Sequence, residues 1–160
     1  RCSDPHPDGR LIMRALLILV VAAQFGGPVA AEVALTDVVS ERGLKGFVTV
    51  DRLPVPAEPV LQQGRTVWEG TCMACHGGNK ATGSPKITAT KKWKPRIAQG
   101  LPTLIEHAVQ GFIGKTYSEM PARGGNPDLT DEQIASAVAF MVWASGGKDA
   151  VLDFITTEKE

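Results

Sequence analysis

Apolar side chains recur with the period of an α-helix in two segments near the middle of the chain. The first runs from about Pro59 to Gly70 and begins with a proline, which the first turn of a helix accepts because its missing N–H would have no partner there. The second runs from about Pro102 to Gln110 and stops at Gly111. Their apolar faces contain Val60, Leu61, Val67 and Trp68 in the first helix, and Leu104, Ile105, Ala108 and Val109 in the second.

A third predicted helix has the clearest start. Thr130 is a favourable N-cap, and Gln133 completes a capping box in which the two side chains bond the free backbone N–H groups of the first turn. The helix is expected to end before the glycine pair at 146–147. Its apolar face contains Ile134, Ala137, Val138, Met141 and Val142. Helices without a strong strand pattern predict a single all-α domain over residues 59–147.

The remaining segments show little periodicity. Residues 77–100 are rich in Gly, Thr, Lys and Pro and predict a loop that wraps around something. Residues 32–58 hold three prolines and predict an N-terminal extension, in which 47–50 is the only short strand indicated. Residues 148–160 are expected to form a C-terminal tail that frays after Phe154.

The beginning of the chain is typical of an export signal. Met13 and Arg14 precede an apolar run that is too short for the roughly 20 residues of a membrane span, and small residues at 29 and 31 favour cleavage after Ala31. We therefore predict a signal peptide at 13–31 and a periplasmic product, with residues 1–12 an upstream extension outside the native protein. A buried core helix or an uncleaved anchor is the alternative.

The charge balance excludes one class of partner. The chain has 17 basic and 17 acidic side chains, and removal of residues 1–31 takes away three arginines and two aspartates, which leaves 14 and 15. Nucleic acid is therefore not expected as a partner, because binding its backbone requires a clear cationic surplus.

The number of cysteines limits the possible chemistry further. Cys2 lies in the removed segment, so that only Cys72 and Cys75 remain, and the only histidines beyond them are His76 and His107. A structural zinc site needs four ligands at finger-like spacings, which this set does not provide.

Cys72 to His76 form the pattern C-x-x-C-H, the attachment motif of a c-type haem. Two thiols three positions apart can add to the two vinyl groups of one haem, and the next imidazole can reach the iron. We therefore predict one covalent haem c with its iron bound by His76. A thioredoxin-like dithiol or a simple disulfide is the alternative, but a dithiol site is expected in a βαβ context that the sequence lacks.

The second axial ligand has two candidates. Met120 precedes Pro121 in a turn-rich stretch that can aim a thioether inwards, and it is the preferred ligand. His107 is the alternative. Met73 lies inside the attachment motif, and Met141 lies on an apolar helix face where core packing is its usual role.

A filled sixth position leaves oxygen, peroxide or nitrite no place on the iron. The sequence therefore predicts an electron carrier and not an enzyme. An enzyme or gas sensor would require that Met120 not bind.

The stretch from residue 59 to 147 resembles the class I monohaem c-type cytochromes, most closely the bacterial c-five type. The motifs that carry the resemblance are Cys72 to His76, Gly83 to Lys86, Trp93 to Gly100, Met120 to Gly125 and Leu129 to Glu132. The resemblance implies a compact helical fold in which the first and last helices cross, so that Gly64 and Trp68 meet the region of Phe140 and Trp143.

The same resemblance implies further site residues. The Pro85 carbonyl is expected to accept a hydrogen bond from His76, and Trp93 and Arg96 are expected beside the haem propionates, although a solvated surface position is the alternative for these two. The extension at 32–58 has no counterpart in the family type and could be a docking arm.

Redox proteins are the expected partners. Lys80, Lys86, Lys91, Lys92, Lys94 and Arg96 fall in a stretch without an acidic residue, which could form a positive docking patch for an acidic donor or acceptor or simply a solvated loop. A third hypothesis makes the chain a subunit or domain docked to a larger oxidase or dehydrogenase, through which it could associate with a membrane.

Overall fold

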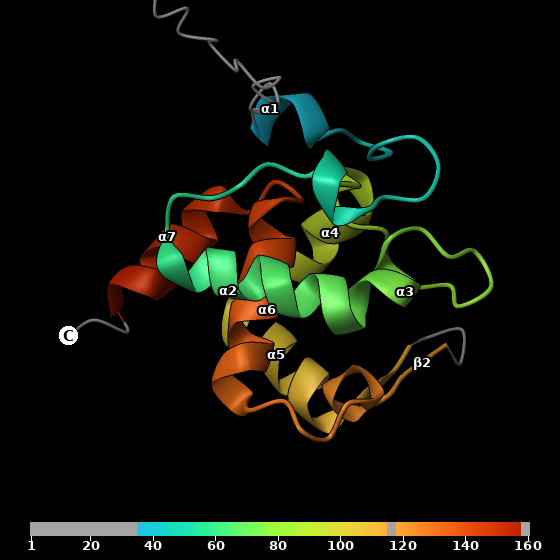
Figure 1. Ribbon diagram of the computed structural model, residues 1–160, viewed down its shortest axis with the longest axis vertical. Helices are drawn as coiled ribbons and strands as arrows, with labels where there is room; N and C mark the ends of the chain where they lie inside the picture. Colours follow the sequence, from blue (N-terminus) through green and yellow to red (C-terminus); the bar gives the residue numbers. More distant parts are fainter. Residues whose placement is uncertain (1–34, 115–117, 158–160) are drawn as a thin grey trace, which may run out of the picture. The chain divides into compact units, whose positions relative to one another are not determined.

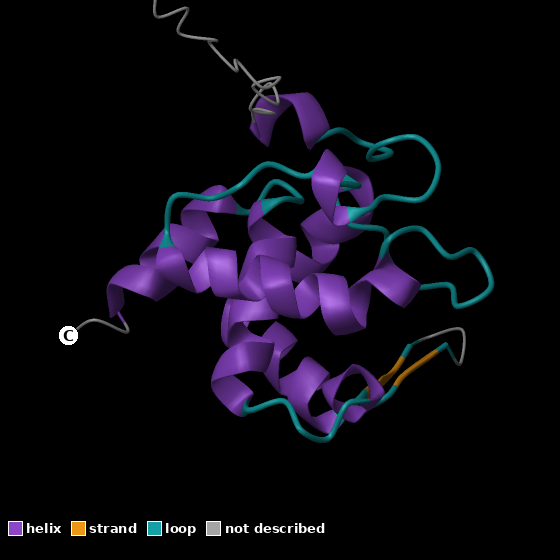
Figure 2. Cartoon of the chain, in the orientation of Figure 1, coloured by secondary structure: helices purple, strands orange, loops and turns teal. Residues whose placement is uncertain are grey.

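The computed structural model describes residues 35–114 and 118–157, and the regular structure of these residues is almost entirely helical (Figure 1, Figure 2). The longer helices are α2 (Pro59–Val67), α4 (Thr90–Ile97), α5 (Leu101–Gln110), α6 (Asp131–Trp143) and α7 (Lys148–Thr157). The shorter helical turns are α1 (Leu35–Val38), η1 (Val50–Arg52), η2 (Trp68–Cys72), α3 (Met73–His76) and η3 (Ala122–Gly125). Two short strands, β1 (Phe112–Ile113) and β2 (Glu119–Met120), pair antiparallel. The predicted all-α fold class is confirmed.

Helices α2 and α6 cross at close range (Figure 1). A β-carbon on Gly64 of α2 would overlap the carbonyl oxygen of Ser136 and lie 3.0 Å from the β-carbon of Phe140, so only glycine fits at the crossing. Next to it the fully buried ring of Trp68 packs on Phe140 with ring centroids 6.2 Å apart, and Phe140 packs on Trp143 at 6.0 Å. The crossing expected from the family resemblance is therefore present.

The start of α6 also forms as predicted. The Thr130 hydroxyl accepts from the backbone N–H of Gln133, and the Gln133 side chain accepts from the backbone N–H of Thr130. The Thr130 side chain, together with the free N–H groups of the first turn, also holds the pKa of the exposed Glu132 carboxyl below its usual value. The capping box thus fixes the residue at which α6 leaves the loop that contains Met120.

Three predictions of local structure were wrong. The predicted loop at 77–100 contains helix α4. The helix buries Trp93 and leaves the lysines around it exposed. One buried residue in so short a helix does not produce a recognisable helical period in the sequence. Pro95 lies within α4 but costs only one hydrogen bond in so short a helix.

The predicted tail at 148–160 begins with helix α7. Val151 and Ile155 lie one helical turn apart and are buried in the core, and burial of one such side chain contributes about 2 kcal/mol. The short strand indicated at 47–50 does not form. The backbone N–H of Val48 instead donates to the carbonyl of Gly77.

The signal peptide predicted at 13–31 and the extension at 1–12 lie outside the described residues. Among the described residues, no helix is both long enough and apolar enough to cross a bilayer.

The close approach of α2 and α6 gives a direct test of the fold. We expect Gly64→Ala to destabilise the haem-loaded protein by about 3 kcal/mol, because the new methyl group must push the helices apart. Gly70→Ala is the matched control, since a β-carbon there has no atom within 4 Å, and it should leave the free energy of unfolding unchanged or raise it by up to about 1 kcal/mol. Denaturant unfolding measures both, and equal stabilities of the two variants would contradict the crossing.

Candidate haem site

The attachment motif lies on one continuous helical run. Helix α2 passes through the wider π-helical turn η2 into α3, which places Cys72 at the end of η2 and Cys75 and His76 within α3. Both thiols are free and half-buried. The three side chains predicted to hold the haem are therefore presented on less than two helical turns.

The environment of Cys72 does not suit a redox dithiol. Burial, with a smaller contribution from the neighbouring Cys75, raises the pKa of the Cys72 thiol to about 11. Catalytic dithiols need a lowered pKa, because the thiolate is the attacking species. A neutral thiol that is also not engaged in a disulfide fits thioether attachment better than thiol–disulfide exchange.

The ring of His76 is held in one orientation by a backbone carbonyl in the loop that follows it. The ring is buried, and Nδ1 lies 2.9 Å from the carbonyl oxygen of Pro85. Because a carbonyl only accepts, Nδ1 carries the proton and donates, which leaves the lone pair of Nε2 for a metal. The hydrogen bond that the family resemblance implies is thus present.

Burial is the main cause that lowers the pKa of His76. The positive charge of Arg96 lowers it further, whereas the hydrogen bond to Pro85 acts in the opposite direction. A lowered pKa keeps the imidazole neutral, and the neutral imidazole is the form that binds iron.

Trp93 and Arg96 both belong to α4 and lie close to His76. Trp93 is buried, with its ring centroid 6.3 Å from that of His76, so the alternative of a solvated surface position is wrong for this residue. Its indole N–H donates to the carbonyl of Lys86 at 2.9 Å and is therefore already used within the chain. Arg96 is half-exposed and donates to the carbonyl of Lys92. A propionate contact for either residue stays a prediction.

Met120 lies on β2, opposite Phe112 on β1, and packs against the hydrophobic core. The turn η3 that follows it lies against the attachment run, because a β-carbon on Gly124 would meet the side chain of Thr71 at 2.8 Å. The structure therefore brings the loop of Met120 next to the residue before Cys72. The ring of the alternative ligand, His107, packs against that of Phe112 in a tilted arrangement, with ring centroids 4.3 Å apart.

These residues fit a c-type haem. Two free thiols, one imidazole with Nε2 available and one thioether loop packed against the same helical run form the donor set that such a group requires.

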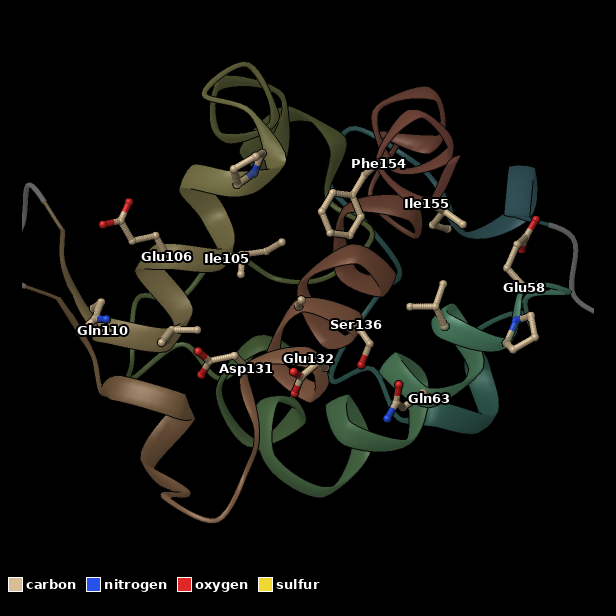
Figure 3. Close-up of a pocket in the computed structure, with 15 residues that line it drawn as sticks. Glu58, Gln63, Ile105, Glu106, Gln110, Asp131, Glu132, Ser136, Phe154 and Ile155 are labelled. Atoms are coloured by element: carbon tan, nitrogen blue, oxygen red, sulfur yellow. The ribbon is translucent and has the colours of Figure 1, made fainter. Parts of the chain in front are cut away.

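A groove of about 850 Å³ lies elsewhere, between α2, α5, α6 and α7 (Figure 3). Its lining includes Ile105 and Phe154, which face the groove from α5 and α7, and the carboxylates of Glu106 and Glu132. None of the residues predicted to hold the haem lines it, so this groove is not the haem site.

Sequence reasoning missed the contribution of residues 40–53. These residues pack against the loop that follows His76, and Val48 and Leu53 within them are buried. The only available signal was a few isolated apolar residues among turn formers, which is too weak to predict a contact.

Comparison with known proteins agrees with this site. A family model described as cytochrome c oxidase, cbb3-type, subunit III matches residues 59–141. Cytochrome c-555 of Prosthecochloris aestuarii is 47% identical over 87 residues, which cover 51% of this chain and 85% of that protein. Cytochrome c-555 of Chlorobaculum tepidum is 43% identical over 82 residues, 51% of this chain and 74% of that protein, and that of Chlorobaculum thiosulfatiphilum is 39% identical over 82 residues, 51% and 93%.

The helical fold and the attachment run define a small haem-binding domain for electron transfer. With the matches, the chain belongs to the class I monohaem c-type cytochromes and carries one covalent haem c with iron. The relatives are named cytochrome c-555, and the more specific c-five type stays a prediction.

Proposed function

We propose that this haem c electron carrier shuttles single electrons in the periplasm with its iron held between His76 and Met120. The observation that carries the proposal is the hydrogen bond from Nδ1 of His76 to Pro85, which leaves Nε2 to face a metal. A bound haem iron supplies one-electron chemistry between its ferric and ferrous states.

The protein's own residues attach and orient the group. Cys72 and Cys75 would hold the group through two thioether S–C bonds, and His76 is positioned one residue further along the same run. Buried Trp93, whose ring centroid lies 6.3 Å from that of His76, shields one side of the imidazole from water. Because the ligands are on rigid elements, little reorganisation is needed when the charge of the site changes.

The placement of Met120 supports thioether ligation. The residue is fixed by the strand pair on one side, and η3 after it packs on Thr71 of the attachment run, whereas the ring of His107 packs against Phe112 of β1. Thioether ligation raises the reduction potential relative to two imidazoles. With both axial positions filled by the protein, the iron carries electrons and does not bind a substrate.

A docked role is the second candidate. The matching family model is described as an oxidase subunit, which favours association with a larger complex. In that case the membrane association of the protein would depend on its partner.

Met120→Ala tests the ligation. We expect the variant to lose the sulfur-to-iron charge-transfer band of the oxidised protein, and its reduced form to bind carbon monoxide rapidly, because a coordination site opens. Met141→Leu, which alters a buried methionine of α6, is the control and should keep the band. Retention of the band in Met120→Ala, or its absence from the parent protein, would overturn the proposal.

The proposed docking patch is smaller than the sequence suggested. Lys80, Lys91, Lys92 and Lys94 are exposed, but Lys86 donates to the carbonyl of Leu44 and is turned towards the chain itself. In addition, Glu41 lies beside Lys91 and Lys94 and lowers the local positive charge. We propose that the exposed lysines of α4 still attract an acidic redox partner.

Charge reversal on α4 tests the patch. Lys92→Glu combined with Lys94→Glu should slow electron transfer to an acidic partner protein by about tenfold at low salt, and the difference should shrink as salt is added. Lys148→Glu combined with Ala150→Glu also adds negative charge, but on α7, and should have little effect on the rate of electron transfer to the same partner. Equal rates for the two double variants at low ionic strength would remove the patch.

A further inference from the structure

Residues 40–53 form a strap that lies outside the region matched by the family model, which begins at residue 59. The strap is anchored at its end on α2, where Arg65 donates to the carbonyl of Val50 at 2.8 Å and Leu53 is 2% exposed. Within the strap, Arg52 donates to the carbonyls of Lys45 and Phe47 and closes its turn. The strap is therefore a folded element and not a free arm.

The first contact of the strap is with the residue that follows His76. The backbone N–H of Val48 donates to the carbonyl of Gly77 at 2.7 Å, and the side chain of Val48 is fully buried. A β-carbon on Gly77 would lie 2.7 Å from the end of the Phe47 ring and 2.9 Å from the carbonyl of Val48. The strap thus presses directly on the backbone next to the iron ligand.

The second contact is with the residue that follows Pro85. The ammonium group of Lys86 donates to the carbonyl of Leu44. Its aliphatic stem also covers Gly78, at which a β-carbon would meet it at 2.7 Å. Gly77 follows His76, and Lys86 follows Pro85. The strap therefore contacts the chain neighbour of each partner in the hydrogen bond between His76 and Pro85.

A third contact fixes the end of the same loop. Thr88 is fully buried and adopts a left-handed backbone with φ of 72°, which costs a β-branched residue about 1–3 kcal/mol. The backbone N–H of Leu44 donates to the Thr88 hydroxyl at 2.9 Å, and that of Ser40 donates to the Thr88 carbonyl at 3.2 Å. Ser145 of the core binds the Thr88 N–H at 3.0 Å. These three hydrogen bonds offset the cost of the left-handed backbone at Thr88 and tie the end of the loop to the strap and to the core.

We propose that the strap is a positioning element for His76, which keeps the bond from its Nδ1 to Pro85 closed. The inference rests on the proposed ligation of iron by His76. A closed bond makes the imidazole a stronger donor, which favours the ferric state and lowers the reduction potential. The strap would thereby set the potential through residues that do not touch the ligand themselves.

Lys86→Met and Val48→Pro test the proposal, because each removes one hydrogen bond between strap and loop. We expect the His76 Nδ1 proton, followed by NMR in the haem-loaded protein, to exchange with water about tenfold faster, which corresponds to the net worth of one hydrogen bond. The reduction potential should rise.

Two controls separate positioning from charge and from general destabilisation. Lys45→Met removes the same charge from an exposed position of the strap, and Val151→Ala weakens the buried core from α7 without changing any residue of the strap. If neither test variant exchanges faster than its control, or if the potential falls, the positioning role is wrong. Absence of the haem spectrum from the parent protein would instead refute the proposed function itself.

Discussion

The hydrogen bond from His76 to the carbonyl of Pro85 is the interaction on which the site depends. It determines which ring nitrogen carries the proton, and therefore which one is left for iron. A buried imidazole without such a partner could rotate or change tautomer, and the two thiols alone would not orient it. Buried Trp93 packs beside this imidazole, and the backbone N–H of Ile87, in the loop that ends at Thr88, donates to the carbonyl of His76 at 2.8 Å.

The helical frame supplies the rigidity behind that bond. Gly64 allows the backbones of α2 and α6 to approach each other directly, and the buried rings of Trp68 and Phe140 fill the space beside them. Burial of such large aromatic side chains contributes several kcal/mol, more than the roughly 1 kcal/mol net of one hydrogen bond. Packing therefore holds the attachment run in place, while hydrogen bonds choose the orientation of its side chains.

Sequence reasoning predicted the features that depend on local chemistry. The first turn at Pro59, the capping box at Thr130 and the attachment motif all involve residues within a few positions of each other, and all are present. Helices α4 and α7 were missed, because each buries only one or two side chains and its stability comes from tertiary contacts that leave no clear period.

The site shows the same division between local and long-range information. Cys72, Cys75 and His76 are adjacent in sequence, and their pattern indicates their chemistry. The role of the strap depends on contacts such as Leu44 with Lys86, which are separated by 42 positions and carry no motif. The contact of Pro85 with His76 came from family resemblance, since a proline does not indicate a haem by itself. The same resemblance implied a propionate contact for Trp93, whereas the structure shows its ring beside His76.

The mass of the peptide that contains residues 72–76 tests the central claim most directly. The protein should be produced in a host that attaches haem c and then digested, and the peptide analysed after acidic organic extraction, which removes haem that is not covalently bound. Thioether attachment predicts a peptide heavier by one whole haem, which the Cys72→Ala, Cys75→Ala double variant lacks. A peptide with the mass of its amino acids alone, or a haem that is lost on extraction, would contradict the account.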